Sequence, residues 1–268
     1  MMADLQHIAM LLLLGYPTAS EMLDPDYPVL MQRLGGLALT LFITVAGLLG
    51  GFALGVLLVA CRRNPLIDSR RDPGERLLGR TMQGAATAFV EGVRGLPVIL
   101  LVLIVFSLPY PLSGLRLPGV VLATVAFGLY AAAYLSESLR AGLRAVDPQL
   151  RESGRVLGLS GMQVFAHIEL PIIYRTMRPD LINVAVTVFK DTSTLAVVAV
   201  PELTYTGRQM LMSEPHNYGI VLLVVLFLYW VPSTVLSAWA QRTEQRQTRL
   251  EAFTSTQIGT LMNKGERM

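Results

Sequence analysis

The sequence predicts an all-α polytopic membrane protein with about five transmembrane helices, its N-terminus outside and its C-terminus inside. Three observations lead to this fold class. Only 15% of the 268 residues are charged, against about 25% in a soluble domain. The uncharged residues gather in runs long enough to cross a membrane, and the arginines gather in alternate connections.

Four runs contain no charged residue: 34–61, 95–115, 117–136 and 217–241. Each meets the length of about 20 residues that a bilayer span requires. A fifth run, 181–200, is apolar in both halves but carries Lys190 and Asp191 at its middle. Charges inside a membrane are costly and usually mark function; this run counts as a span because its two halves are otherwise apolar. The predicted spans are about 34–60, 89–112, 117–141, 178–200 and 217–240.

Arginines cluster in the connection 61–80, in the connection 144–180 and after Trp239. The positive-inside rule places these segments on the cytoplasmic side. The segment 1–33 is then periplasmic, and 242–268 is a cytoplasmic tail, helix-compatible to Phe253 and expected to be disordered beyond it. The net charge of +3 therefore reports membrane topology, and no nucleic-acid partner is expected.

The start of the chain, MMADLQHIAMLLLLGYP, has an apolar run without a basic n-region. A cleaved signal peptide is therefore not expected, and an interfacial helix on the outer face is. The single Cys61 excludes an intrachain disulfide.

Small residues recur in the first span at Gly47, Gly51 and Gly55. This spacing places them on one helix face, where another backbone can approach closely; chance spacing among 23 glycines is the alternative. Near the second span, Glu91 and Arg94 stand three apart and can pair on one helical face. That pair is either structural or part of a substrate path.

The connection from Arg144 to Pro171, called the elbow below, is predicted to form two short helices with a tight joint. Asp147 is a good N-cap with Pro148 at the first helical position, and Gly158 suits the left-handed position that ends the first helix. Ser160 begins a capping box with Gln163, which opens the second helix. Pro171 then precedes the next span.

Several apolar residues of the elbow are expected to be exposed and to need a cover: Leu157, Leu159, Val164, Phe165 and Ile168. An elbow that combines apolar and basic side chains indicates a docking element for a partner protein. A merely solvated connection is the alternative.

One elbow pattern resembles the EAA motif of ABC importer permeases: Glu152-Ser153-Gly154, then Gly158, then Ile168-x-Leu170-Pro171. Ser153 and Gly154 stand where that motif has alanines. Three further segments resemble the polar amino acid branch of the family, and all the segments together lie within roughly 28–246. They are FVEGVRGLPVILLVLIV (with Gly95 and Pro97), FGLYAAAYLSESLRAGLRAV and FKDTSTLAVVAVPEL.

This resemblance implies the ABC type I importer permease fold in the bacterial inner membrane, in contact with membrane lipid. A second permease subunit, identical or paralogous, would complete the pathway. The elbow would be the coupling helix for a separate ABC ATPase, which binds ATP and Mg, and a periplasmic or lipid-anchored binding protein would deliver an amino acid. The residues implied for ATPase coupling are Asp147, Glu152, Ser153, Gly154, Leu157, Gly158, Ser160, Phe165, Leu170 and Pro171.

The residues themselves favour a separate ATPase. A Walker A motif ends in Gly-Lys-Ser/Thr, whereas the only lysines, Lys190 and Lys264, are followed by Asp and Gly. The chain is expected to be neither the ATPase nor an enzyme by itself, and to carry no cofactor.

An amino acid carries charges of both signs, so a site within the membrane needs polar groups of both signs or many hydrogen bonds. Adjacent residues do not share a helix face, so either a kinked or broken turn at Lys190 or a packing role for one of the two charged residues is expected. The alternative role of these polar groups is interhelical hydrogen bonding or dimer contact. The candidate pathway residues are Tyr130, Tyr134, Glu137, Lys190, Asp191, Thr192 and Ser193.

An ion- or proton-coupled secondary transporter of a small polar solute is the alternative function, with Asp191, Glu137 and Glu91 as a relay. Five spans without a repeat fit poorly with the inverted repeats of many such carriers. An intramembrane enzyme is not expected, because all three histidines lie outside the predicted spans and no H-E-x-x-H pattern occurs. Neither a catalytic residue nor a metal site is predicted.

Overall fold

A computed structural model of the chain describes residues 12, 36–62, 73–213 and 218–265. The prediction for the periplasmic segment falls outside these residues, except at Leu12. All named elements in the described part are helical, and one isolated β-bridge joins Gly36 to Glu202. In chain order the elements are α2 (Gly36–Arg62), α3 (Pro73–Gly95), α4 (Val98–Ser107), α5 (Pro109–Ser113), α6 (Gly119–Arg144), α7 (Pro148–Val156), α8 (Gly161–Val164), the π-helix η2 (Phe165–Glu169), α9 (Leu170–Asp191), the 3₁₀-helix η3 (Thr192–Val198), α10 (Leu203–Ser213) and α11 (Tyr218–Gly265).

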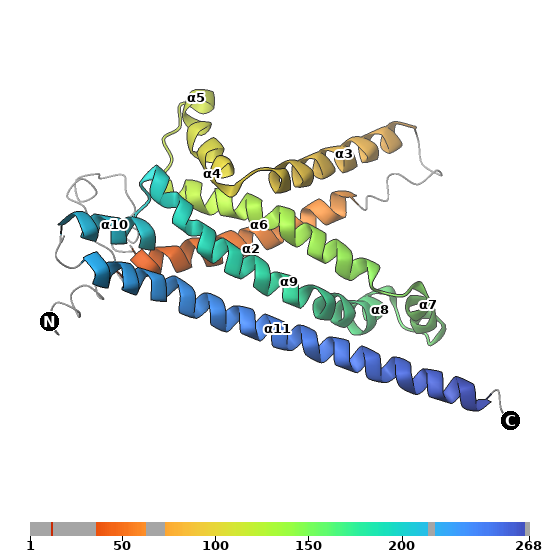
Figure 1. Cartoon of the computed structure of the whole chain (residues 1–268). Coiled ribbons are helices and arrows are strands. Elements are labelled where there is room, and N and C mark those ends of the chain that lie inside the picture. The colour runs from red at the N-terminus through yellow and green to blue at the C-terminus, as the bar shows by residue number, and fades with distance from the viewer. Residues whose placement is uncertain (1–11, 13–35, 63–72, 214–217, 266–268) are drawn as a thin grey trace.

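Four long helices, α2, α6, α9 and α11, run along one another, and α3 and α4 form a V against α6 (Figure 1). Helix α6 is central because it contacts α2, α3, α4 and α9. Its buried face includes many small side chains, among them Ala126, Ala131, Ala132 and Ala133. Small residues let membrane helices pack at close range, where dispersion and backbone contacts replace the hydrophobic effect.

The predicted close approach at the glycine stripe of α2 is confirmed. All three glycines are buried against α6. A Cβ placed on Gly51 would lie 2.6 Å from the Cβ of Ala131 and 2.8 Å from the carbonyl oxygen of Gly128. A Cβ on Gly50, one position along the same helix, would meet nothing within 4 Å. Only the buried positions of the stripe therefore require glycine.

Four helical stretches are long and apolar enough to cross a membrane: Gly36–Arg62, Gly119–Arg144, Gly161–Val198 and Tyr218–Arg242. A bent pair, Leu77–Gly95 with Val98–Ser113, makes the number up to five if the pair is one span.

The second predicted span, 89–112, is not one straight helix. The pair bends by 115° at the break between Gly95 and Val98. Pro97 explains this bend, because proline has no N–H to continue the helix and disfavours the helical conformation at Leu96.

Two other boundaries differ from the sequence prediction. The fourth span was predicted to begin near residue 178, whereas the continuous helical stretch begins at Gly161. The tail was predicted to lose order beyond Phe253, whereas α11 continues to Gly265. Extending an existing helix adds one hydrogen bond per ordered residue, and the costly nucleation has already been met.

A buried carboxylate, Glu202, joins α10 and α11. The residue is 0% exposed and accepts hydrogen bonds from the backbone N–H groups of Thr204 at 2.9 Å and Tyr205 at 2.7 Å. The hydroxyl of Tyr229 in α11 donates to Glu202 Oε2 at 2.8 Å. Burial raises the pKa of the Glu202 carboxyl, and these donors only partly offset that rise.

Candidate functional site

The first helix of the elbow begins as the sequence predicted. The Asp147 side chain accepts a hydrogen bond from the backbone N–H of Gln149 at 2.9 Å, and Pro148 occupies the first turn of α7. An extended N-cap residue followed by proline satisfies one free N–H and removes another. The predicted cap is confirmed.

The joint between the elbow helices is also confirmed. Gly158 has φ +82°, the left-handed conformation in which a side chain would be strained. Its N–H donates to the carbonyl of Arg155 at 3.0 Å. The Ser160–Gln163 capping box forms with both of its hydrogen bonds, at 2.8 and 3.3 Å.

The prediction that Pro171 separates the second elbow helix from the next span is wrong. Helix α8 passes into the π-helix η2 and then into α9, with Pro171 in the first turn of α9. The N–H of Leu170 donates to the carbonyl of Phe165, five residues earlier. In an ordinary α-helix it would donate to the carbonyl four residues earlier. A wider turn accommodates a proline ring that would otherwise clash with the carbonyl four residues earlier. The elbow is therefore continuous with a membrane span.

The apolar residues of the elbow divide into two sets. Val164 is buried and Leu159 and Ile168 are half-buried, so these three are not the exposed residues that the sequence predicted. They pack over Gly154, where an added Cβ would meet Ile168 Cδ1 at 2.8 Å and Val164 Cγ2 at 3.1 Å. A small residue at position 154 thus allows α7 to close onto the second helix.

The exposed apolar residues lie on the surface of the elbow, on both sides of the joint at Gly158. Val156 is 87% exposed, Leu157 80% and Met162 75%, and Phe165 is also exposed. Val156 and Met162 were missed in the sequence, although both flank the predicted joint. An ion pair with 3.0 Å between Arg151 Nε and Glu169 Oε1 holds the two sides of the elbow together.

The remaining coupling candidates are placed on this same unit. Glu152 and Ser153 are exposed on α7, and Leu170 is exposed at the start of α9. The elbow is thus a closed helical unit with an apolar tip and polar flanks.

A cavity of about 500 Å³ lies between α3, α6 and α9. The predicted pathway residues Tyr130, Tyr134 and Glu137 line it from α6. The Tyr130 and Tyr134 ring centroids are 4.7 Å apart. The guanidinium carbon of Arg94 lies 5.5 Å from the centroid of the Tyr134 ring. The cavity therefore presents charges of both signs and two aromatic faces.

Three further lining residues, Asp180, Asn183 and Thr187, come from α9 and were missed in the sequence. Their spacing of three and four residues places polar groups on one helix face. That period, inside a largely apolar segment, is the signal that could have found them.

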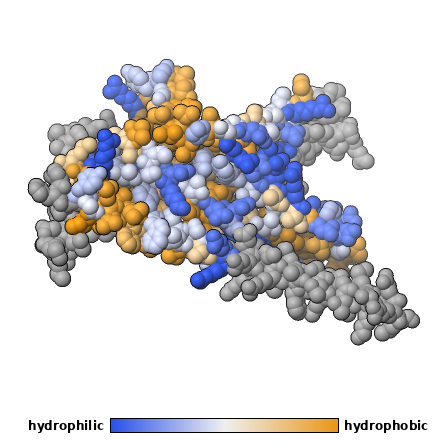
Figure 2. Space-filling view, in the orientation of Figure 1, coloured by the Kyte–Doolittle hydropathy of each residue, from blue (hydrophilic) through white to orange (hydrophobic). Residues whose placement is uncertain are grey.

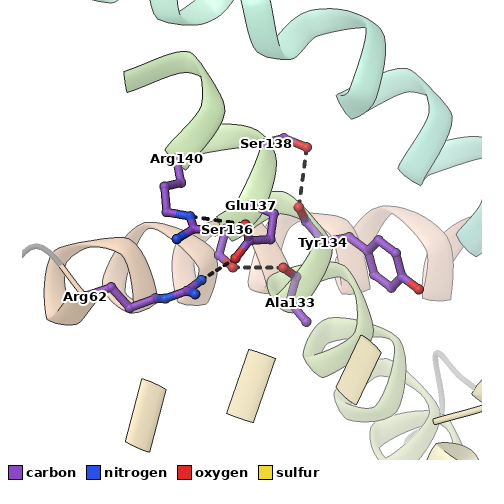
Figure 3. A network of polar contacts seen from close by, with 7 residues as sticks. All are labelled: Arg62, Ala133, Tyr134, Ser136, Glu137, Ser138 and Arg140. Carbon is purple, nitrogen blue, oxygen red and sulfur yellow. Dashed lines mark hydrogen bonds and ion pairs between the residues drawn. The ribbon is translucent and has the colours of Figure 1, made fainter. Parts of the chain in front are cut away.

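Glu137 lies between Arg62 and Arg140 in a network of polar contacts (Figure 3). Its carboxylate binds Arg62 from α2 and accepts hydrogen bonds from Arg140 Nη2 at 2.6 Å and Nε at 3.1 Å. Two guanidinium groups on one carboxylate satisfy both of its oxygens and hold the ends of α2 and α6 together.

The predicted group from Lys190 to Ser193 lies apart from the cavity wall. Among the described residues that line the cavity, none belongs to this group. Lys190 is exposed and Thr192 is buried, with its hydroxyl donating to the Phe189 carbonyl at 2.8 Å. The broken turn expected here is found, since α9 ends at Asp191 and a 3₁₀-helix follows.

Glu91 and Arg94, which the sequence allowed to pair or to take part in a substrate path, are separated in the structure, and Arg94 lines the cavity. The described part of the chain shows no ion pair between them, because Arg94 turns to the ring of Tyr134 while Glu91 is exposed. Gly95 and Pro97 do have the structural role expected of that segment, since they flank the 115° bend.

Comparison with known proteins decides the family. The family model for "Binding-protein-dependent transport system inner membrane component" matches residues 74–249. This chain belongs to that family. Among curated relatives, the glutamine transport system permease protein GlnP of Escherichia coli (strain K12) is 30% identical over 223 residues, covering 83% of this chain and 94% of the relative.

A second curated relative and two solved structures are also similar to this chain. The probable glutamine ABC transporter permease protein GlnM of Bacillus subtilis (strain 168) is 32% identical, covering 77% of this chain and 89% of its own. A crystal structure of an amino acid ABC transporter with histidines has a TM-score of 0.64 at 22% sequence identity, and the match covers 79% of this chain and 92% of that one. An inward-facing structure of the MetNI methionine ABC transporter has a TM-score of 0.52 at 18% sequence identity, and the match covers 77% of this chain and 91% of that one. These structures establish the type I importer permease fold.

Proposed function

We propose that this chain is the permease subunit of an ATP-driven, binding-protein-dependent importer of polar amino acids in the bacterial inner membrane. The elbow carries this proposal. Its caps, its joint and the Arg151–Glu169 ion pair close it into a unit with an exposed apolar tip. Because the second half of that unit continues into α9, a force applied to the tip reaches the membrane span directly.

The proposed partner at the elbow is a separate ATPase that binds ATP and Mg. The chain has no Gly-Lys-Ser/Thr sequence of its own with which to cradle a phosphate. A second permease subunit and a periplasmic or lipid-anchored binding protein complete the proposed importer.

The cavity supports an amino acid as the cargo. Arg94 faces it with a positive charge, and Glu137 and Asp180 with negative charges. Together with Asn183 these groups match an ammonium and a carboxylate. Relatives in the comparison are named for glutamine, arginine and cystine.

Co-purification of the ATPase tests the coupling role. Gly158→Pro forces φ near −65° on a joint that has +82°, and Glu152→Lys reverses an exposed charge. We expect both variants to reach the membrane normally and to lose the co-purified ATPase. Gly161→Ala is the matched control, since it has open space around it and ordinary φ. Normal ATPase recovery with both test variants would count heavily against the elbow as the docking element.

Uptake measurements test the transport pathway. We expect ATP-dependent uptake, insensitive to an uncoupler, in vesicles containing the whole complex. Asn183→Leu should lower this uptake without loss of the ATPase, because it removes an amide from the cavity wall. Lys190→Ala is also expected to lower uptake if the broken turn of α9 contributes to the path. Thr176→Val, on the exposed surface of α9 and outside the cavity lining, is the control. Full uptake by both test variants would remove the pathway proposal.

A further inference from the structure

A second, basic pocket lies beside the cavity described above, between the C-terminal ends of α2 and α6 and the middle of α3. Its volume is about 340 Å³. The residues that line it are Arg62, Gln83, Thr87, Arg140, Leu143 and Arg144.

The charge of this pocket is unbalanced. Among its described lining residues there are three guanidinium groups and no carboxylate. The carboxylate of Glu137, which binds Arg62 and Arg140, faces the neighbouring cavity. One carboxylate against three guanidinium groups leaves two positive charges in excess. The Arg62 side chain is only 6% exposed and is paired with Glu137; the excess positive charge of the pocket as a whole favours an additional counter-anion.

The depth of the pocket follows from helix geometry. Arg140 lies 21 residues after Gly119, the first residue of α6. At 1.5 Å per residue this is about 32 Å, close to the thickness of the hydrocarbon core. Arg62 and Arg144 are the last residues of their spans. The pocket therefore lies at the headgroup level of one leaflet, and the positive-inside rule makes it the cytoplasmic leaflet.

The polar groups of the pocket suit a phosphate. Guanidinium groups present parallel N–H donors that match phosphate oxygens, and Gln83 and Thr87 add an amide and a hydroxyl. Hydrophilic residues gather between α3 and the elbow end of the bundle (Figure 2). Arg144, at the rim, is exposed and has no ion pair with any residue in the described ranges.

We propose that this pocket binds a phosphate-bearing anion, and that the headgroup of an anionic phospholipid supplies it. Such a ligand joins α2, α3 and α6 at one point. Basic pockets between membrane helices on the cytoplasmic side are a recurrent form of headgroup site. Helix α3 gains most from it, because α3 otherwise projects from the bundle beyond its bend with α4 (Figure 1).

Lipid retention tests the proposal directly. The full chain is purified with its partner subunits, washed in neutral detergent, and its bound phosphatidylglycerol is quantified by mass spectrometry. We expect retention by the wild type and about tenfold lower retention by Arg144→Gln, a loss that corresponds to about 1.4 kcal/mol. Gln83→Leu, at another exposed position of the pocket, is a second test variant. Arg80→Gln is the matched control, since it removes the same charge from α3 outside the pocket.

Thermal unfolding in nanodiscs distinguishes the two sources of phosphate. Phosphatidylglycerol should raise the midpoint of the wild type above its value in phosphatidylcholine alone, and less so for Arg144→Gln. If millimolar inorganic phosphate in phosphatidylcholine gives that same variant-sensitive rise, while phosphatidylglycerol gives none, the lipid source is overturned. Equal lipid loss in Arg144→Gln and Arg80→Gln, or no effect of either probe, overturns the pocket itself.

Discussion

The close contact between α2 and α6 predicts a sharp difference between two neighbouring glycines. Replacement of Gly51 by alanine places a methyl group 2.6 Å from the Ala131 Cβ, 2.8 Å from the Gly128 carbonyl oxygen and 3.0 Å from the Ala132 backbone nitrogen. Two of these atoms belong to the backbone and cannot rotate away. The helices must therefore separate by roughly 1 Å to reach ordinary contact distances near 3.5–4 Å.

The magnitude is the difference between two opposing effects. Overpacking a well-filled core costs about 1–3 kcal/mol, and rigid backbone on the receiving side puts Gly51→Ala toward the upper end. Alanine returns about 1 kcal/mol of helix propensity. The net loss is then about 1–2 kcal/mol. The added methyl of Gly50→Ala meets nothing within 4 Å. Only the gain in helix propensity then remains, so the substitution should be neutral or stabilising by up to about 1 kcal/mol.

Thermal unfolding of the purified complex in one detergent, followed for both variants beside the wild type, measures this difference. We expect the midpoint of Gly51→Ala to fall and that of Gly50→Ala to stay level or rise. Gly55→Ala, whose added Cβ would meet backbone atoms at 3.3 Å, should fall between them. Equal midpoints for Gly50→Ala and Gly51→Ala would refute the argument that backbone contact requires glycine.

Three further predictions concern the elbow and two carboxylates. Gly158→Ala should lower ATP-driven uptake, since a left-handed alanine costs about 1–2 kcal/mol at the joint, while Gly161→Ala should leave uptake unchanged. Glu137→Gln leaves the buried Arg62 with a neutral partner, and loss of one partner of a buried pair costs about 3–5 kcal/mol; partial exposure of Glu137 reduces this to about 2 kcal/mol, readable as a lower unfolding midpoint. Burial raises the Glu202 pKa, so between the ordinary value of 4.5 and that raised value the folded chain holds more protons than the unfolded one. The unfolding free energy therefore falls as pH rises through that window. Glu202→Gln should abolish this slope in midpoints measured against pH, and an unchanged slope would contradict the assignment.

Local rules predicted several parts of the elbow and the bundle. Asp147, Gly158 and the Ser160–Gln163 box act through atoms a few residues apart, so the sequence alone is enough to find them. The glycine stripe of α2 was visible because a four-residue period defines one helix face. The partner helix, however, appears only in the structure.

The cavity shows where sequence reasoning reached its limit. Two charges at mid-span drew attention to Lys190 and Asp191, yet the cavity wall is made by α6 with Arg94 from α3 and a polar face of α9. Arg94 contacts the ring of Tyr134 rather than Glu91, because helix packing brings the centroid of that ring to 5.5 Å from the guanidinium carbon of Arg94. A pair along one helix is read from spacing, but a contact between helices depends on how they cross.

The sequence by itself determined the class of protein, the apolar segments, the caps of the elbow and the absence of a Walker A motif. These depend on composition and on neighbours within about one helical turn. Pro97 accounts locally for the break between α3 and α4, but only the tertiary structure showed its 115° angle, the continuity of the elbow with α9, and the position of Glu137 between Arg62 and Arg140. Each of these joins residues far apart in the chain or depends on how a helix bends, and no local periodicity encodes either.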